Sequence, residues 1–143
     1  MIRLTKIFHF ETAHAIHGYI GACKNVHGHS YELHVTVAAP NSETTFIPAP
    51  GFLIDFKDIK RIVKAAIVEK FDHKLILSSA FVKENPSFVS QDNLLIWEAE
   101  PTAENILLYV VQVMQKELPD SIRLAHLKLY ETKDSYAEWI YSS

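Results

Sequence analysis

The chain has 143 residues, nearly half of them apolar, which predicts one globular domain over residues 1–143 with a real core and little room for a second unit. The formal net charge of −3 argues against a general nucleic-acid binder, and no apolar run approaches the length of a membrane-spanning helix. The single cysteine, Cys23, excludes an internal disulfide, and the absence of a signal-peptide pattern leads us to expect the protein in the cytoplasm.

Two segments near the N-terminus alternate between apolar and polar residues. Over residues 2–14 the apolar positions share the face of Phe10, and over residues 27–38 they share the face of Leu33. Period two is typical of half-buried strands, so both segments are predicted to be strands. The stretch over residues 40–51 contains prolines and serines and is expected to form a connection or a hairpin loop.

The spacing between apolar residues becomes longer from Asp55 onwards. Apolar residues recur there at steps of three and four, which predicts an amphipathic helix ending near Phe71. A second helix is predicted over residues 101–118, because it begins with a proline and is stopped by the proline that follows. The intervening residues 78–100 are predicted to be irregular, apart from a short strand over residues 94–97.

Two more alternating segments, residues 123–131 and 135–141, are predicted to be strands. The expected order of elements is therefore two strands, two helices and two strands (ββααββ). This order favours an α+β domain in which a four-stranded antiparallel sheet carries both helices on one face.

Three histidines fall on the apolar faces of the first two strands. His27 and His29 are two residues apart, so both point to the same side of their strand. If the first two strands pair, His14 arrives as a third ligand. Ordinary histidines hydrogen-bonded near a strand end would be the simpler interpretation, but three unpaired imidazoles are costly to bury. The pattern indicates a catalytic zinc site with one open coordination position.

Cys23 lies in the loop before His27, and its spacing leaves two roles open, while a lone buried structural thiol is a third, less favoured interpretation in this polar loop. As a fourth zinc ligand it would close a structural site. As a catalytic thiol it would be activated by the nearby cation and by Lys24.

Two acidic positions invite a functional interpretation. Asp72 and His73 follow the first helix, where a solvated helix end is favoured over a proton relay. Glu131 ends an otherwise apolar row on its strand, and it would suit a pocket carboxylate that anchors paired N–H donors better than a surface strand end. Glu104 is interpreted as an ordinary acid in the first turn of the second helix.

Six short motifs carry a resemblance to a known family. They are FETAH (residues 10–14), CKNVHGHSY (23–31), LIDF (53–56), FDH (71–73), PTAEN (101–105) and YET (130–132). In this order and spacing the chain resembles the 6-pyruvoyltetrahydropterin synthase and 6-carboxytetrahydropterin synthase family over almost its whole length. The resemblance implies a T-fold (tunnelling fold), whose strands join those of neighbouring subunits into a barrel. It also implies a homohexamer, a dimer of trimers, with sites between subunits.

The resemblance implies a role for each candidate residue. Cys23 would be the thiol that abstracts a proton, with Asp72 and His73 as its relay partners. Glu131 would anchor the amino-pyrimidine edge of a pterin, helped by backbone around Thr102 and Ala103. Zn²⁺ would be held by His14, His27 and His29.

The implied substrate is 7,8-dihydroneopterin triphosphate. Three residues separate Cys23 from His27, which looks like the bacterial enzymes of queuosine and deazapurine biosynthesis that make 6-carboxy-5,6,7,8-tetrahydropterin and release acetaldehyde and triphosphate. A 6-pyruvoyltetrahydropterin synthase is the nearest alternative, and a non-catalytic zinc-stabilised assembly module is the alternative of a different class. Lys24 and Lys74 are candidates for contact with the triphosphate.

Overall fold

Six strands form one sheet in the order β4-β3-β1-β2-β5-β6 in the computed structural model, which describes residues 1–41 and 44–143. Residues 42 and 43, part of the predicted 40–51 connection, lie outside the described residues. The strands are β1 (Arg3–His14), β2 (His27–Ala38), β3 (Lys74–Ser78), β4 (Leu94–Trp97), β5 (Arg123–Thr132) and β6 (Ser135–Ile140).

The register between β1 and β2 decides which side chains meet at the end of the sheet. The two strands are antiparallel, and their last pair places His14 directly opposite His27. Two residues further along β2, His29 lies opposite Thr12. Since side chains alternate along a strand, the three histidines share the face that buries Phe10.

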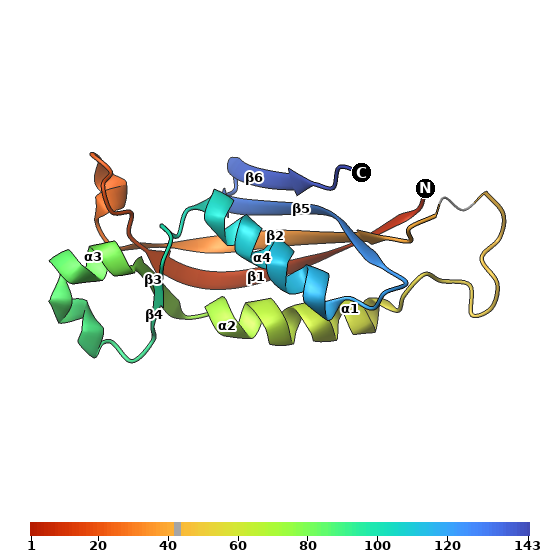
Figure 1. The fold of residues 1–143 in the computed structure, drawn as a ribbon, viewed down its shortest axis with the longest axis horizontal. Coiled ribbons are helices and arrows are strands. Elements are labelled where there is room, and N and C mark those ends of the chain that lie inside the picture. The colour runs from red at the N-terminus through yellow and green to blue at the C-terminus, as the bar shows by residue number, and fades with distance from the viewer. Residues whose placement is uncertain (42–43) are drawn as a thin grey trace.

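Two helical rods cover this face of the sheet (Figure 1). The first is built from α1 (Phe56–Val63), a π-helical turn (Lys64–Val68) and α2 (Glu69–Phe71), and it begins where the Asp55 side chain accepts a hydrogen bond from Lys57 N at 2.8 Å. The second is α4 (Ala103–Glu117), whose N-cap Thr102 accepts from Asn105 N at 3.2 Å. Both predicted helices are therefore present, and both pack into one core.

The prediction of a four-stranded antiparallel sheet is wrong. Strand β3 runs parallel to β1, and β4 runs parallel to β3, so the sheet is mixed and has six strands. Leu75, Ile76 and Leu77 of β3 are all buried. A short strand that is buried on both faces is apolar at every position. A search for alternating apolar and polar residues therefore does not detect it.

The segment over residues 78–100 is also more regular than predicted. It contains α3 (Ser79–Glu84), a 3₁₀ turn (Pro86–Ser90) and β4, the last as expected. In Figure 1, α3 lies at the same end of the molecule as the loop between β1 and β2, and residues of both line one cleft. None of the helices in the described part of the chain is long and apolar enough to span a bilayer.

Candidate metal centre and adjoining cleft

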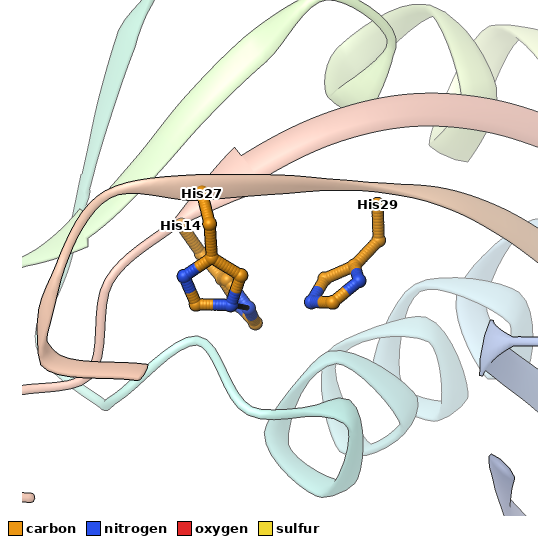
Figure 2. A group of neighbouring side chains, drawn as sticks. All are labelled: His14, His27 and His29. Carbon is orange, nitrogen blue, oxygen red and sulfur yellow. Dashed lines mark hydrogen bonds between the residues drawn. The ribbon is translucent and has the colours of Figure 1, made fainter. Parts of the chain in front are cut away.

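The three histidines predicted as metal ligands come together. His14 on β1 and His27 and His29 on β2 each offer a nitrogen, and these atoms lie within 4.8 Å of one another. Figure 2 shows His27 and His29 on the same side of β2 with their rings directed toward His14. The strand register therefore assembles a cluster that the spacing along the chain only suggested.

Backbone carbonyls orient two of these rings. His14 Nδ1 donates to the carbonyl oxygen of Pro101 at 2.7 Å, and His27 Nδ1 donates to that of Asn25 at 2.7 Å. A proton on Nδ1 leaves Nε2 as the acceptor, and the two Nε2 atoms face each other at 3.1 Å. This is the arrangement of metal-bound histidines, whose other ring nitrogen is fixed by a hydrogen bond from behind.

The surroundings of His29 indicate whether a cation would fit between the three rings. Its Nε2 is buried, and it has no hydrogen-bond partner among the residues that the structure describes. Glu131 Oε1 is 3.1 Å away, but the contact lacks the alignment of a hydrogen bond. Buried polar atoms are normally satisfied, so an ion between the rings would account for this one.

The charge state of the cluster also suits a metal. Burial lowers the pKa of His14, and burial likewise lowers the pKa of His29. Neutral imidazole is the form of histidine that binds a metal, so the lowered pKa values of His14 and His29 favour metal binding at neutral pH. Within the described chain the ligand cluster consists of the three histidines alone, and Cys23 is not part of it.

A cleft beside the cluster gathers most of the other predicted residues. Cys23, a half-buried free cysteine, lines it together with His14. The N-terminal end of α4 contributes Thr102 and Ala103, and β5 contributes Glu131. Glu104, interpreted from the sequence as a first-turn acid, lies in the first turn of α4 and lines the same cleft.

Glu131 reaches this cleft by the alternation of side chains along β5. Leu129 pairs with Leu33 of β2, on the face that carries the three histidines, and Glu131 lies two residues further along on the same face. The register of β5 against β6 shifts between Tyr130 and Thr132, so the pairing with β6 is irregular at this point. The Glu131 carboxylate therefore lies beside the histidines at the end of β2, with Oε1 3.1 Å from His29 Nε2.

Asp72 and His73 lie elsewhere. Asp72 Oδ1 accepts from Glu11 N at 2.9 Å, and this hydrogen bond is the main cause of the lowered pKa of Asp72. The His73 backbone has φ of 61°, an uncommon value for a non-glycine residue, and its Nδ1 lies 3.1 Å from Asp72 Oδ2. His73 lines a separate cleft with Glu11 and Ser30, so a single chain does not bring this pair to the cleft of Cys23.

The two lysines proposed for the triphosphate are also separated. Lys24 lines the cleft between the β1–β2 loop and α3, and Lys74 lines the cleft of His73. Neither is among the residues that line the Cys23 cleft in the described chain.

Three further groups at the cluster were not among the residues predicted from the sequence. The carbonyls of Pro101 and Asn25 are backbone groups, which leave no signature in the choice of residue. The Tyr31 hydroxyl lies 3.4 Å from His14 Nδ1, and burial raises the pKa of Tyr31 above its ordinary value. Tyr31 is two residues from His29 on the same strand, and this shared parity is the sequence signal that could have placed it beside the cluster.

Comparisons with known proteins found relatives over nearly the whole chain. The family model described as 6-pyruvoyl tetrahydropterin synthase matches residues 3–140. The 6-carboxy-5,6,7,8-tetrahydropterin synthase of Rickettsia bellii is 32% identical, and the match covers 96% of this chain and 99% of that protein. A solved structure of an uncharacterized protein from Wolinella succinogenes has a TM-score of 0.79 at 16% identity, covering 99% of this chain and 98% of the other. The 6-pyruvoyl tetrahydropterin synthase of Caenorhabditis elegans has a TM-score of 0.69 at 18% identity, covering 99% and 96%.

Proposed function

The chain belongs to the 6-pyruvoyl tetrahydropterin synthase family, and from this premise we propose that it converts 7,8-dihydroneopterin triphosphate to 6-carboxy-5,6,7,8-tetrahydropterin, with release of acetaldehyde and triphosphate. The observation that carries the proposal is the convergence of three imidazoles beside a cleft lined by the Cys23 thiol and the Glu131 carboxylate. The choice of product follows the Rickettsia bellii relative, which is similar over nearly its full length. The proposed pathway is queuosine and deazapurine biosynthesis.

The pterin would be held by Glu131 and by the start of α4. A carboxylate can accept two parallel hydrogen bonds from an amino-pyrimidine edge, which recognises the ring and fixes its orientation. Thr102 is the N-cap of α4 and Ala103 its first residue, so both lie at the helix end where the first backbone N–H groups have no partner within the helix. Glu131 and these two residues line the same cleft, which supports their joint role.

Cys23 would take a proton from the carbon side chain of the bound substrate. A thiolate can act as a general base when it is positioned within reach of that proton. His14, His27 and His29 would hold Zn²⁺, which when bound supplies Lewis acidity toward the side-chain oxygens. Asp72 and His73 would move protons to and from Cys23. Because His73 lines another cleft of the same chain and Asp72 lies beside His73, the pair serving one Cys23 would come from a neighbouring subunit.

The proposed assembly is a homohexamer built as a dimer of trimers. The outer edges of β4 and β6 have no strand partner in the part of the chain that the structure describes. Exposed strand edges can pair with other chains, and pairing between copies would extend the sheet into the barrel of a T-fold. This assembly is also what would bring Asp72 and His73 close to Cys23.

The direct test is incubation of the zinc-loaded protein with 7,8-dihydroneopterin triphosphate, with products identified by mass. We expect 6-carboxytetrahydropterin and acetaldehyde. A 6-pyruvoyl product would favour the alternative that the family name suggests. A protein that is inert towards pterins and unfolds on chelation would favour a zinc-stabilised assembly module instead.

A further inference from the structure

The three residues that lead into α4 touch several parts of the candidate site. The Pro101 carbonyl holds the ring of His14, and Thr102 caps the helix. Glu100, the first of the three, is half-buried and extends its side chain to the loop between β1 and β2. This carboxylate has no role in the proposed reaction so far, which makes its contacts informative.

Glu100 joins two separate segments of the chain. Its Oε1 accepts a hydrogen bond from the backbone N–H of His17 at 2.7 Å, 83 residues away in sequence. Its own carbonyl oxygen accepts from Asn105 Nδ2 at 2.9 Å and from Thr102 N at 2.9 Å. The backbone of Glu100 is therefore fixed to the first turn of α4, while its carboxylate is hydrogen-bonded to the loop between β1 and β2. A hydrogen bond to an ionised acceptor is among the stronger ones in proteins.

One more hydrogen bond connects the restrained backbone around His17 to Cys23. Ile16 N donates to the Cys23 carbonyl oxygen at 2.8 Å, so the outgoing and returning sides of the loop are joined there. Beyond this junction the loop is open, with Ile20 at its apex 99% exposed. The position of Cys23 therefore depends on the base of the loop rather than on packing at its tip.

Another contact from α3 to the same residue is weaker. The His17 ring lies 3.6 Å from Glu84, whose side chain is 69% exposed. Exposed ion pairs of this kind contribute little, because water screens them and the side chains lose freedom. The short, part-buried hydrogen bond from His17 N to Glu100 is the firmer restraint.

We propose that Glu100 is a positioning residue: its carboxylate holds the β1–β2 loop against the start of α4, so that the Cys23 thiol stays directed at the cleft between the histidine cluster and Glu131. This proposal rests on the proposed function for the catalytic use of Cys23. The restraint itself is a property of the loop and can be measured without any substrate.

The test compares three variants of the full-length, zinc-loaded protein. Glu100→Ala removes the acceptor, and Glu100→Gln keeps an oxygen that can accept from His17 N. Glu98→Ala is the matched control, because it removes the same charge two residues away, where Glu98 Oε2 accepts from Ser79 Oγ at the surface. Cys23 is the only cysteine, so the rate of alkylation by iodoacetamide reports this one thiol.

We expect Glu100→Ala to speed alkylation by about tenfold, the order of effect that follows from losing one hydrogen bond to a charged group. Glu98→Ala should stay within about twofold of the parent protein, and Glu100→Gln, which keeps a weaker neutral hydrogen bond, should fall between the parent and Glu100→Ala. In turnover, Glu100→Ala should lower kcat by about tenfold with little change in KM, because the thiol is displaced and the pterin contacts remain. Zinc content should be unchanged, since the Pro101 carbonyl rather than the Glu100 side chain holds His14.

Three results would overturn the proposal: equal alkylation rates for Glu100→Ala and Glu98→Ala, a Glu100→Gln variant as altered as Glu100→Ala, or loss of zinc from Glu100→Ala. If the parent protein does not convert the pterin at all, the proposed function fails. The alkylation rates would still decide whether Glu100 restrains the loop.

Discussion

His14 Nε2 faces His27 Nε2 at 3.1 Å, and a backbone carbonyl behind each ring keeps the pair in this orientation. Two lone pairs that point at each other at this distance repel, so a proton or a cation between them stabilises the arrangement. The register that pairs these two residues is the last rung of the β1–β2 ladder. The fold therefore orients the histidine rings in advance, so that metal binding requires little movement of these side chains.

Removing one of these ligands should weaken metal binding. For His27→Ala we expect zinc affinity to fall by more than about 100-fold, because even the loss of an outer-shell partner costs about 10- to 100-fold. Competition with a chromogenic chelator measures the change. His34→Ala is the control, since His34 is on the same strand but pairs with Glu32 at 2.7 Å, outside the cluster. Equal affinities in the two variants would show that the cluster is not the zinc site.

The role of Cys23 can be separated from that of the histidines. We expect Cys23→Ala to lose turnover by at least about a thousandfold while it retains one zinc ion per chain, because the thiol is outside the ligand cluster. Metal analysis after gel filtration and a product assay provide the two measurements. Zinc loss from this variant would identify Cys23 as a fourth ligand, and the catalytic hypothesis would then be wrong.

The histidine cluster could be predicted from the sequence because it depends only on alternation within two strands and on the pairing of those strands. Alternation along each strand placed His14, His27 and His29 on buried faces, and the strands then paired side by side as assumed. The same kind of reasoning missed β3, since a strand buried on both faces does not alternate. It therefore underestimated the sheet by two strands.

Other features depend on information that no local pattern contains. Glu100 meets His17 only because the chain returns to the end of β1 after 83 residues. The turn that holds His73 at φ of 61° is fixed by contacts with Glu11 on a distant strand. Contacts of this type arise from tertiary packing, so the sequence indicated His73 without its contact to Glu11 and did not indicate Glu100 at all.

Asp72 predicts a dependence of stability on acid. The pKa of Asp72 is lowered in the folded state, mainly by the hydrogen bond from Glu11 N. In the unfolded chain an Asp carboxyl has its ordinary pKa of about 3.9. A lowered pKa stabilises the fold above the unfolded value, and this contribution is lost as the pH falls through the folded value. The side chain is 38% exposed, so water screens the effect and we expect it to be modest.

The measurement is urea unfolding of the parent protein and of Asp72→Ala at pH 6 and at pH 3. The difference in free energy of unfolding should be larger at pH 6 and should shrink at pH 3. Asp92→Ala, at an exposed turn position, controls for the loss of one negative charge. A difference that grows toward acid pH would contradict the assigned cause.

Glu131 offers the sharpest test of substrate recognition. Glu131→Gln keeps the shape of the side chain but replaces one acceptor oxygen with an N–H donor, which would face a donor on the pterin. Hydrogen bonds to charged groups contribute about 1.5–3 kcal/mol, so we expect KM to rise by about 10- to 100-fold. Zinc content should not change, because the described metal cluster contains no carboxylate. Glu138→Gln is the matched control: Glu138 pairs with the His126 ring at 2.7 Å and is absent from the residues lining the Cys23 cleft in the described chain. If both variants keep the parental KM, the pterin is anchored elsewhere, and if Glu131→Gln loses zinc, the carboxylate next to His29 belongs to the metal site.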